Sequence, residues 1–129
     1  MSEPPRDSKT VLVADHRGPE RQVLDSVLRR LGYAVLTVET ATELEAMLHG
    51  PTVVDLVILG SDLYRDSADD MARAISRPDR RVILVEASER QTKEVVGFID
   101  MTENAIRGIN VRVPEIVFLA NDLLYSRSG

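Results

Sequence analysis

Cysteine is absent from this chain of 129 residues, and histidine occurs only twice. Without thiols the chain can form no disulfide framework, no thiolate zinc site and no iron–sulfur cluster, and it has no cysteine nucleophile. Two histidines leave little for a histidine-rich metal site. The composition therefore predicts a protein without a metal centre or a cofactor.

Aromatic residues and basic charge are also scarce. Aromatics make up 4% of the chain, which disfavours a stacking platform for bases or sugars. The chain has 16 Lys and Arg residues against 21 Asp and Glu, a net charge of −5. Because binding to a phosphate backbone requires a basic face, we expect no nucleic acid to bind this domain by itself.

Long apolar runs are missing too. None approaches the roughly 20 residues that a membrane-spanning helix needs, so no membrane partner is predicted. Residues 1–10 are polar and lack the apolar core of a secretory signal, which favours a cytoplasmic protein. The length suits one domain. We expect a flexible leader over residues 1–9 and a single domain over residues 10–129.

Short apolar runs alternate with amphipathic segments along the rest of the chain. Strands are predicted at residues 11–14, 33–38, 53–59, 82–85 and, more weakly, 109–113. Helices are predicted at about 19–31, 42–48, 69–75, 90–104 and 115–127. Either Thr40 with Glu43 or Thr42 with Glu45 offers a capping box for the second helix. This alternation predicts an α/β fold, a doubly wound parallel sheet that is covered on both faces.

Ligands of such a sheet bind outside the carboxyl ends of its strands. The candidate site therefore consists of the residues that follow the predicted strands, which are Asp15, His16, residues 60–64, residues 86–88, Val113 and Pro114.

Several segments of the sequence resemble the receiver (CheY-like) domain of bacterial two-component response regulators. They are VLVADH, LRRLGYAV, DLVILG, RVILVEA and VPEI. The resemblance covers the chain after the leader, with a few residues inserted in the fourth helix or the loop after it. It implies a flavodoxin-like (βα)5 fold with strand order 2-1-3-4-5. It also implies a bacterial regulator, of which we expect this chain to be the amino-terminal domain.

The resemblance implies a phosphorylation pocket from which this chain departs. Asp15 matches the first of two adjacent acids that hold Mg²⁺ in the family, but His16 stands at the second. Gly60 takes the position of the aspartate that accepts the phosphoryl group. Glycine has no acceptor oxygen, and imidazole is a poor ligand for an ion that prefers hard oxygens.

The remaining key positions depart in the same way. Glu86 stands where the family has the serine or threonine that bonds the phosphoryl oxygen, which places a negative charge there. Val113 replaces the lysine that precedes the matching Pro114, and Asn110 falls at the switch aromatic. Phosphoryl transfer needs an acceptor, a metal and a cation together. These departures predict a degenerate pseudo-receiver that signals without phosphorylation and is not an enzyme.

Two alternative interpretations give this degenerate phosphorylation pocket a binding function. Asp15 could bind a cation with Asp62 and Glu86, or a small ligand could occupy the vacated space. Asp62 is a poor substitute acceptor, because a displacement of two residues spoils in-line geometry. His16 beside these acids could respond to pH, although a polar loop residue is the simpler interpretation.

An enzyme reading rests on residues 15–18. They resemble the DHxG opening of the cysteine-dependent sugar-phosphate isomerases of the ribose-5-phosphate type B family, and Gly32 with Tyr33 also fits. However, the catalytic cysteine and a glycine-rich phosphate loop after the third strand are missing. This alternative is therefore less favoured.

The expected partner is another protein or the output domain of the same regulator. Receiver domains dimerise or dock partners through the fourth helix, fifth strand and fifth helix, so the resemblance implies a possible homodimer there. Apolar side chains that could serve this interface are Phe98, Ile99, Met101 and Phe118. A helix that covers a sheet needs such a stripe for its own packing, which is the competing explanation.

Overall fold

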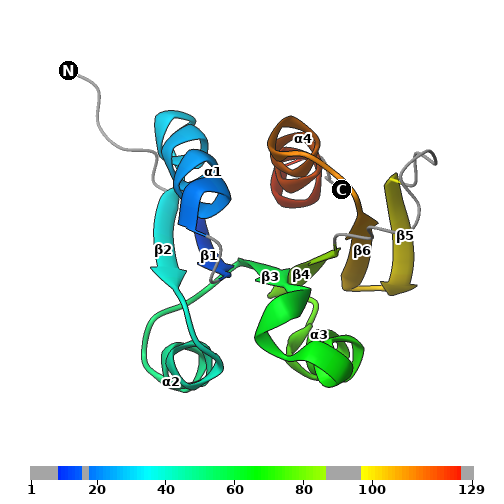
Figure 1. Cartoon of the computed structure of the whole chain (residues 1–129). Coiled ribbons are helices and arrows are strands. Elements are labelled where there is room, and N and C mark those ends of the chain that lie inside the picture. Colours follow the sequence, from blue (N-terminus) through cyan, green and yellow to red (C-terminus); the bar gives the residue numbers. More distant parts are fainter. Residues whose placement is uncertain (1–8, 16–17, 87–96, 126–129) are drawn as a thin grey trace.

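A computed structural model describes residues 9–15, 18–86 and 97–125 of the chain. They form one six-stranded sheet in the order β2-β1-β3-β4-β6-β5 (Figure 1). The strands are β1 (Thr10–Ala14), β2 (Ala34–Val38), β3 (Leu56–Gly60), β4 (Arg81–Glu86), β5 (Gly97–Thr102) and β6 (Ala105–Ile109). The helices are α1 (Gly18–Arg30), α2 (Ala41–His49), α3 (Ala68–Ile75) and α4 (Val113–Tyr125), with the short 3₁₀ turns η1 (Ser61–Leu63) and η2 (Arg65–Ser67) after β3.

The helices cover both faces of the sheet. Figure 1 shows α1 and α4 on one face and α2 and α3 on the other. One buried cluster lies on the α2–α3 side and includes Leu12, Leu44 and Leu84. The other lies on the α1–α4 side and includes Val13, Leu28 and Ile83. The middle residues of β1, β3 and β4 are apolar because both faces of these strands are buried, as expected for a parallel sheet between helices.

The predicted strands at residues 11–14, 33–38, 53–59 and 82–85 correspond to β1 to β4, and the helices between them to α1 to α3. The second helix begins at the first of the two predicted caps. Thr40 Oγ1 accepts a hydrogen bond from the Glu43 amide at 3.1 Å. The Glu43 carboxylate accepts one from the Glu39 amide at 2.8 Å, so Thr40 rather than Thr42 caps the helix.

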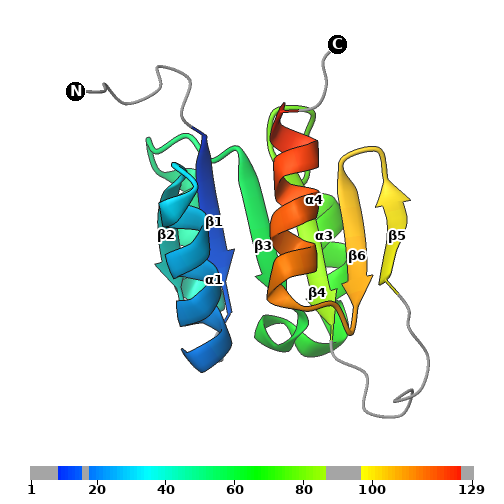
Figure 2. The same cartoon turned by 90° about the horizontal axis from the view of Figure 1, so that it is seen from above.

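The prediction of a helix over residues 90–104 is wrong for its described part. Residues 97–102 form β5, which pairs antiparallel with β6, and Figure 2 shows the two arrows running in opposite directions. Residues 90–96 lie outside the described part of the chain. The sheet is therefore neither purely parallel nor five-stranded, and the order 2-1-3-4-5 becomes 2-1-3-4-6-5.

The prediction of a strand over residues 109–113 is also wrong. The strand beside β4 is β6, which ends at Ile109. Asn110 follows with φ of 57°, a left-handed conformation that asparagine tolerates better than most residues. Asn110 therefore lies beyond the strand and not at a switch position within it. Val113 and Pro114 belong to the first turn of α4 and not to a strand end.

The structure tests the predicted leader and the predicted lack of a membrane-spanning helix only for the residues that it describes. Residues 1–8 of the predicted leader lie outside the described part of the chain, whereas Lys9 is described. Among the described residues, no helix has the length and apolar character needed to cross a membrane.

Candidate functional site

Asp15 and Gly60 lie side by side at the carboxyl ends of β1 and β3. The β1–β3 register pairs Ala14 with Leu59, the residues directly before them. An added Cβ on Gly60 would stand 2.8 Å from Asp15 Cγ and 2.9 Å from its Oδ1. The carboxylate of Asp15 thus occupies the space in which a side chain of residue 60 would begin.

Glu86 does not join this pair. Gly60 is paired with Val85 of β4, and Val85 packs on the α1–α4 side of the sheet. Successive side chains of a strand point to opposite faces, so Glu86 faces the α2–α3 side. There its Oε2 lies 3.7 Å from Nε of Arg107 on β6.

Arg107 on β6 contacts acidic residues of two other elements, β4 and α3. Besides approaching Glu86 of β4, its guanidinium forms an ion pair with Asp69 in the first turn of α3. Its Nε is buried and forms no hydrogen bond, so the contact with Glu86 is purely electrostatic at this distance. The side chains of these three residues are 26% to 39% exposed, so solvent screens the cluster only in part.

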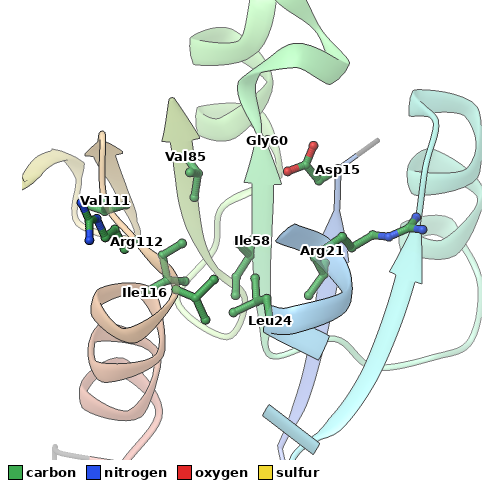
Figure 3. A pocket seen from close by; sticks show the side chains of 11 residues that line it. Asp15, Arg21, Leu24, Ile58, Gly60, Val85, Val111, Arg112 and Ile116 are labelled. Carbon is green, nitrogen blue, oxygen red and sulfur yellow. The ribbon is translucent and has the colours of Figure 1, made fainter. Parts of the chain in front are cut away.

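A cavity of about 320 Å³ lies beneath the Asp15–Gly60 pair on the α1–α4 side (Figure 3). Its lining is mostly aliphatic, from three strands, α1 and α4. The charged residues around it are Asp15, Arg21 and Arg112. Arg21 is paired with Glu39 of the segment after β2 at 2.8 Å. Val113 lines the cavity as well, but from the first turn of α4.

The other predicted site residues lie apart from this cavity or outside the described chain. Asp62 is exposed in η1, and Asn110 and Pro114 are also exposed. His16 lies outside the described residues, so its relation to Asp15 is not part of the structure. No group of three or more His, Asp or Glu side chains with a metal-binding arrangement occurs within residues 9–15, 18–86 and 97–125.

The predicted interface residues differ in exposure. Phe118 on α4 is 76% exposed, and Ile99 and Phe98 on β5 are 49% and 36% exposed. Met101, in contrast, is only partly exposed and packs against the core on the α2–α3 side. Exposed apolar side chains therefore occur both on the edge strand and on the last helix.

Two tyrosines that do not line the cavity have large pKa shifts. Burial, with a smaller electrostatic contribution from Tyr125, raises the pKa of Tyr33 to about 12. Burial and a hydrogen bond donated to Glu45 at 3.1 Å raise the pKa of Tyr64 to about 12. Both shifts favour the neutral phenol, so both tyrosines are uncharged at neutral pH.

Comparison with solved structures finds the same fold in response regulator receiver proteins. One from Sinorhizobium medicae superposes with a TM-score of 0.71 at 17% identity, covering 96% of this chain and 100% of that one. One from Burkholderia phymatum gives 0.64 at 19% identity, with coverage of 91% and 95%. A CheY-like receiver domain from Methanospirillum hungatei gives 0.61 at 17%, with coverage of 90% and 94%.

The sequence itself matches no family model and no curated protein. The chain therefore has a receiver-like α/β fold, a doubly wound and mostly parallel sheet, with one antiparallel strand at its edge.

Sequence reasoning missed the arginines of the site. Arg107 stands alone among small and apolar residues in the segment AIRGI, and a single charge inside a strand indicates a buried ion pair. That signal was present in the sequence. Arg112 carried no such signal, because its place at the cavity depends on where the last strand ends.

Proposed function

We propose that this chain is a regulatory module that has the receiver fold and acts without phosphorylation. The observation that carries the proposal is the Asp15–Gly60 contact. Where receiver chemistry requires an aspartate, this strand ends in a residue without a side chain, and a neighbouring carboxylate fills the space.

The Glu86–Arg107–Asp69 cluster supports the same proposal. In receiver domains the end of the fourth strand must move when the phosphoryl group arrives, as the resemblance implies. Here Arg107 holds the end of β4 to both β6 and α3 through opposite charges. The positive charge of Arg107 attracts both Asp69 and Glu86 and so offsets the repulsion between these two acids. We propose that the end of β4 therefore keeps a single conformation.

The experiment is incubation of the full chain with phosphoramidate and Mg²⁺, followed by intact-mass spectrometry. We expect no gain of about 80 Da, the mass of one phosphoryl group. The variant Gly60→Asp should also gain no mass, because His16, Glu86 and Val113 still stand where the family has its second acid, its serine or threonine and its lysine. An authentic receiver domain, treated in parallel, is the positive control. A phosphorylated wild-type chain would refute the proposal.

We also propose that the output of the module is contact with a protein, through the exposed apolar side chains of β5 and α4. Phe118 is the most exposed of them, and exposed aromatic residues are enriched at protein interfaces. Light scattering of the chain over a range of concentrations tests the homodimer version. Phe118→Ser should then weaken dimerisation, whereas Val53→Ser, at an equally exposed valine before β3, should not. A monomer at every concentration would refute the homodimer.

We also propose that this chain is not an enzyme. The chain has no cysteine, so the isomerase alternative lacks its catalytic cysteine. We expect no interconversion of ribose 5-phosphate and ribulose 5-phosphate by the purified chain in a coupled assay. Turnover that survives further purification would favour the enzyme alternative instead.

A further inference from the structure

The cavity beneath Asp15 and Gly60 has the features of a binding site for a small molecule. Its volume of about 320 Å³ falls within the range of ligand pockets in proteins. In Figure 3, Leu24, Ile58 and Ile116 surround its interior, each from a different element. Gly60 and the Asp15 carboxylate beside it border the cavity at its upper end.

The lining separates into an apolar interior and a charged rim. Seven of the lining residues are aliphatic: Val13, Leu24, Ile58, Val85, Val111, Val113 and Ile116. The two arginines lie at opposite edges of the cavity in Figure 3. An apolar interior of this kind favours a ligand with a hydrocarbon or aromatic group, since binding removes that group from water.

The charged residues at the rim of the cavity favour an anionic group on the ligand. Arg21 is neutralised by Glu39 at 2.8 Å. The Arg112 side chain is exposed and has no ion-pair partner among the residues that the structure describes. In Figure 3 the Arg112 guanidinium points away from the interior of the cavity, so its side chain must rotate to face the mouth. A guanidinium binds a carboxylate through two parallel hydrogen bonds.

We infer that the cavity binds a small amphipathic carboxylate, with its apolar body between α1, α4 and the sheet and its carboxylate on Arg112. The inference does not rest on the proposed absence of phosphorylation, because it depends on the cavity and on Arg112 alone.

The experiment is a titration of the isotope-labelled full chain with cinnamate, followed by amide proton–nitrogen NMR correlation spectra. Cinnamamide, which is neutral, and cinnamylamine, which is cationic, are matched probes with the same body. We expect saturable shifts at Val13, Ile58, Val85 and Ile116, and affinity for cinnamate at least about tenfold higher than for either analogue.

Two variants locate the binding. Arg112→Gln removes the charge at the exposed rim and should weaken cinnamate about tenfold without changing the affinity for cinnamamide. Val85→Phe should fill the cavity and abolish binding of all three probes. Arg73→Gln, which removes an exposed arginine from α3 on the other face, is the control and should leave the affinity for cinnamate unchanged.

Some outcomes would overturn the inference. Absence of saturable binding, equal affinity for the three probes, or tighter binding of cinnamylamine would each do so. Because Arg112 is exposed, its variant keeps the test valid even if Val85→Phe does not fold. Failure of cinnamate to bind leaves the phosphorylation experiment unaffected, so the two proposals can fail separately.

Discussion

The ring of Phe98 lies directly over Gly108 on the neighbouring strand. A Cβ added to Gly108 would stand 2.8 Å from Phe98 Cε1 and 2.9 Å from Val111 Cγ2. The two residues are paired in the β5–β6 register, so the aromatic ring covers a backbone that has no side chain of its own. An aromatic residue opposite glycine stabilises such a pair by shielding the exposed backbone.

This contact predicts that Gly108→Ala destabilises the protein. The added methyl group overpacks the hairpin and should lower the free energy of unfolding by about 1 to 3 kcal/mol. Denaturant titration measures the change. Adding Phe98→Ala should recover part of it, because a smaller side chain leaves room for the methyl group. Equal stability of Gly108→Ala and the wild type would contradict the contact.

The Asp15–Gly60 contact predicts coupling between two substitutions. Gly60→Ala should cost about 2 kcal/mol of stability, because its Cβ meets the Asp15 carboxylate. In the Asp15→Ala background the same change should cost at least about 1 kcal/mol less. Gly50→Ala is the control, since its Cβ would meet only backbone oxygens, at 3.4 Å or more. Strictly additive effects would mean that the two residues do not touch.

Removal of Arg107 should loosen the sheet edge. Arg107→Met keeps most of the packing of the side chain and leaves Asp69 and Glu86 without their cation. Because these acids are partly exposed, the expected loss is only about 1 kcal/mol, and it should shrink at high salt. A double-mutant cycle with Asp69→Asn measures the pair itself. A coupling energy of zero would remove the electrostatic support for a fixed end of β4.

The cap of α2 can be tested by two neighbouring threonines. Thr40→Ala removes the hydrogen bond to the Glu43 amide and should destabilise the protein by about 1 kcal/mol. Thr42→Ala, inside the helix and exposed, should be neutral or slightly stabilising, because alanine is the better helix former. Thermal unfolding of both variants decides between them. The reverse order would mean that the helix begins at the second predicted cap.

The two shifted tyrosines predict a loss of stability in alkali. Each has a pKa of about 12 in the folded protein against 10.0 for an ordinary tyrosine. A raised folded pKa stabilises the fold fully below pH 10 and progressively less as the pH rises toward 12. Unfolding free energy measured across this range should fall. The fall should be smaller in Tyr33→Phe and Tyr64→Phe and smallest in the double variant. An unchanged slope in that double variant would assign the fall to other groups.

Much of the fold follows from local patterns in the sequence. The runs that became β1, β3 and β4 are apolar on both faces, and only a sheet between two helical layers accommodates them. Their alternation with amphipathic helices predicts a doubly wound sheet, whereas the strand order was implied only by the resemblance to receiver domains. The contact between Asp15 and the end of β3 follows as well, because parallel strands in register end at one edge.

The edge of the sheet could not be predicted in the same way. In residues 97–102 the spacing of Phe98 and Met101 fits a helix, yet these side chains face opposite sides of a strand. The two-residue turn at Glu103 and Asn104 between apolar runs was the available signal for a hairpin. A helix predicted in place of the hairpin displaces the following strand by four residues, from 105–109 to 109–113, and so puts Val113 in a strand and not in α4.

The antiparallel edge has a consequence for the order of folding. Strand β6 pairs with β5 across a turn of two residues and with β4 across a longer stretch of chain. A hairpin of this kind forms within about 1 to 10 μs, whereas a parallel pair must wait until its crossover connection has been ordered. The β5–β6 hairpin can therefore form early and offer β4 a strand that is already extended. Among the described strands, this edge is where assembly of the sheet can begin without a crossover.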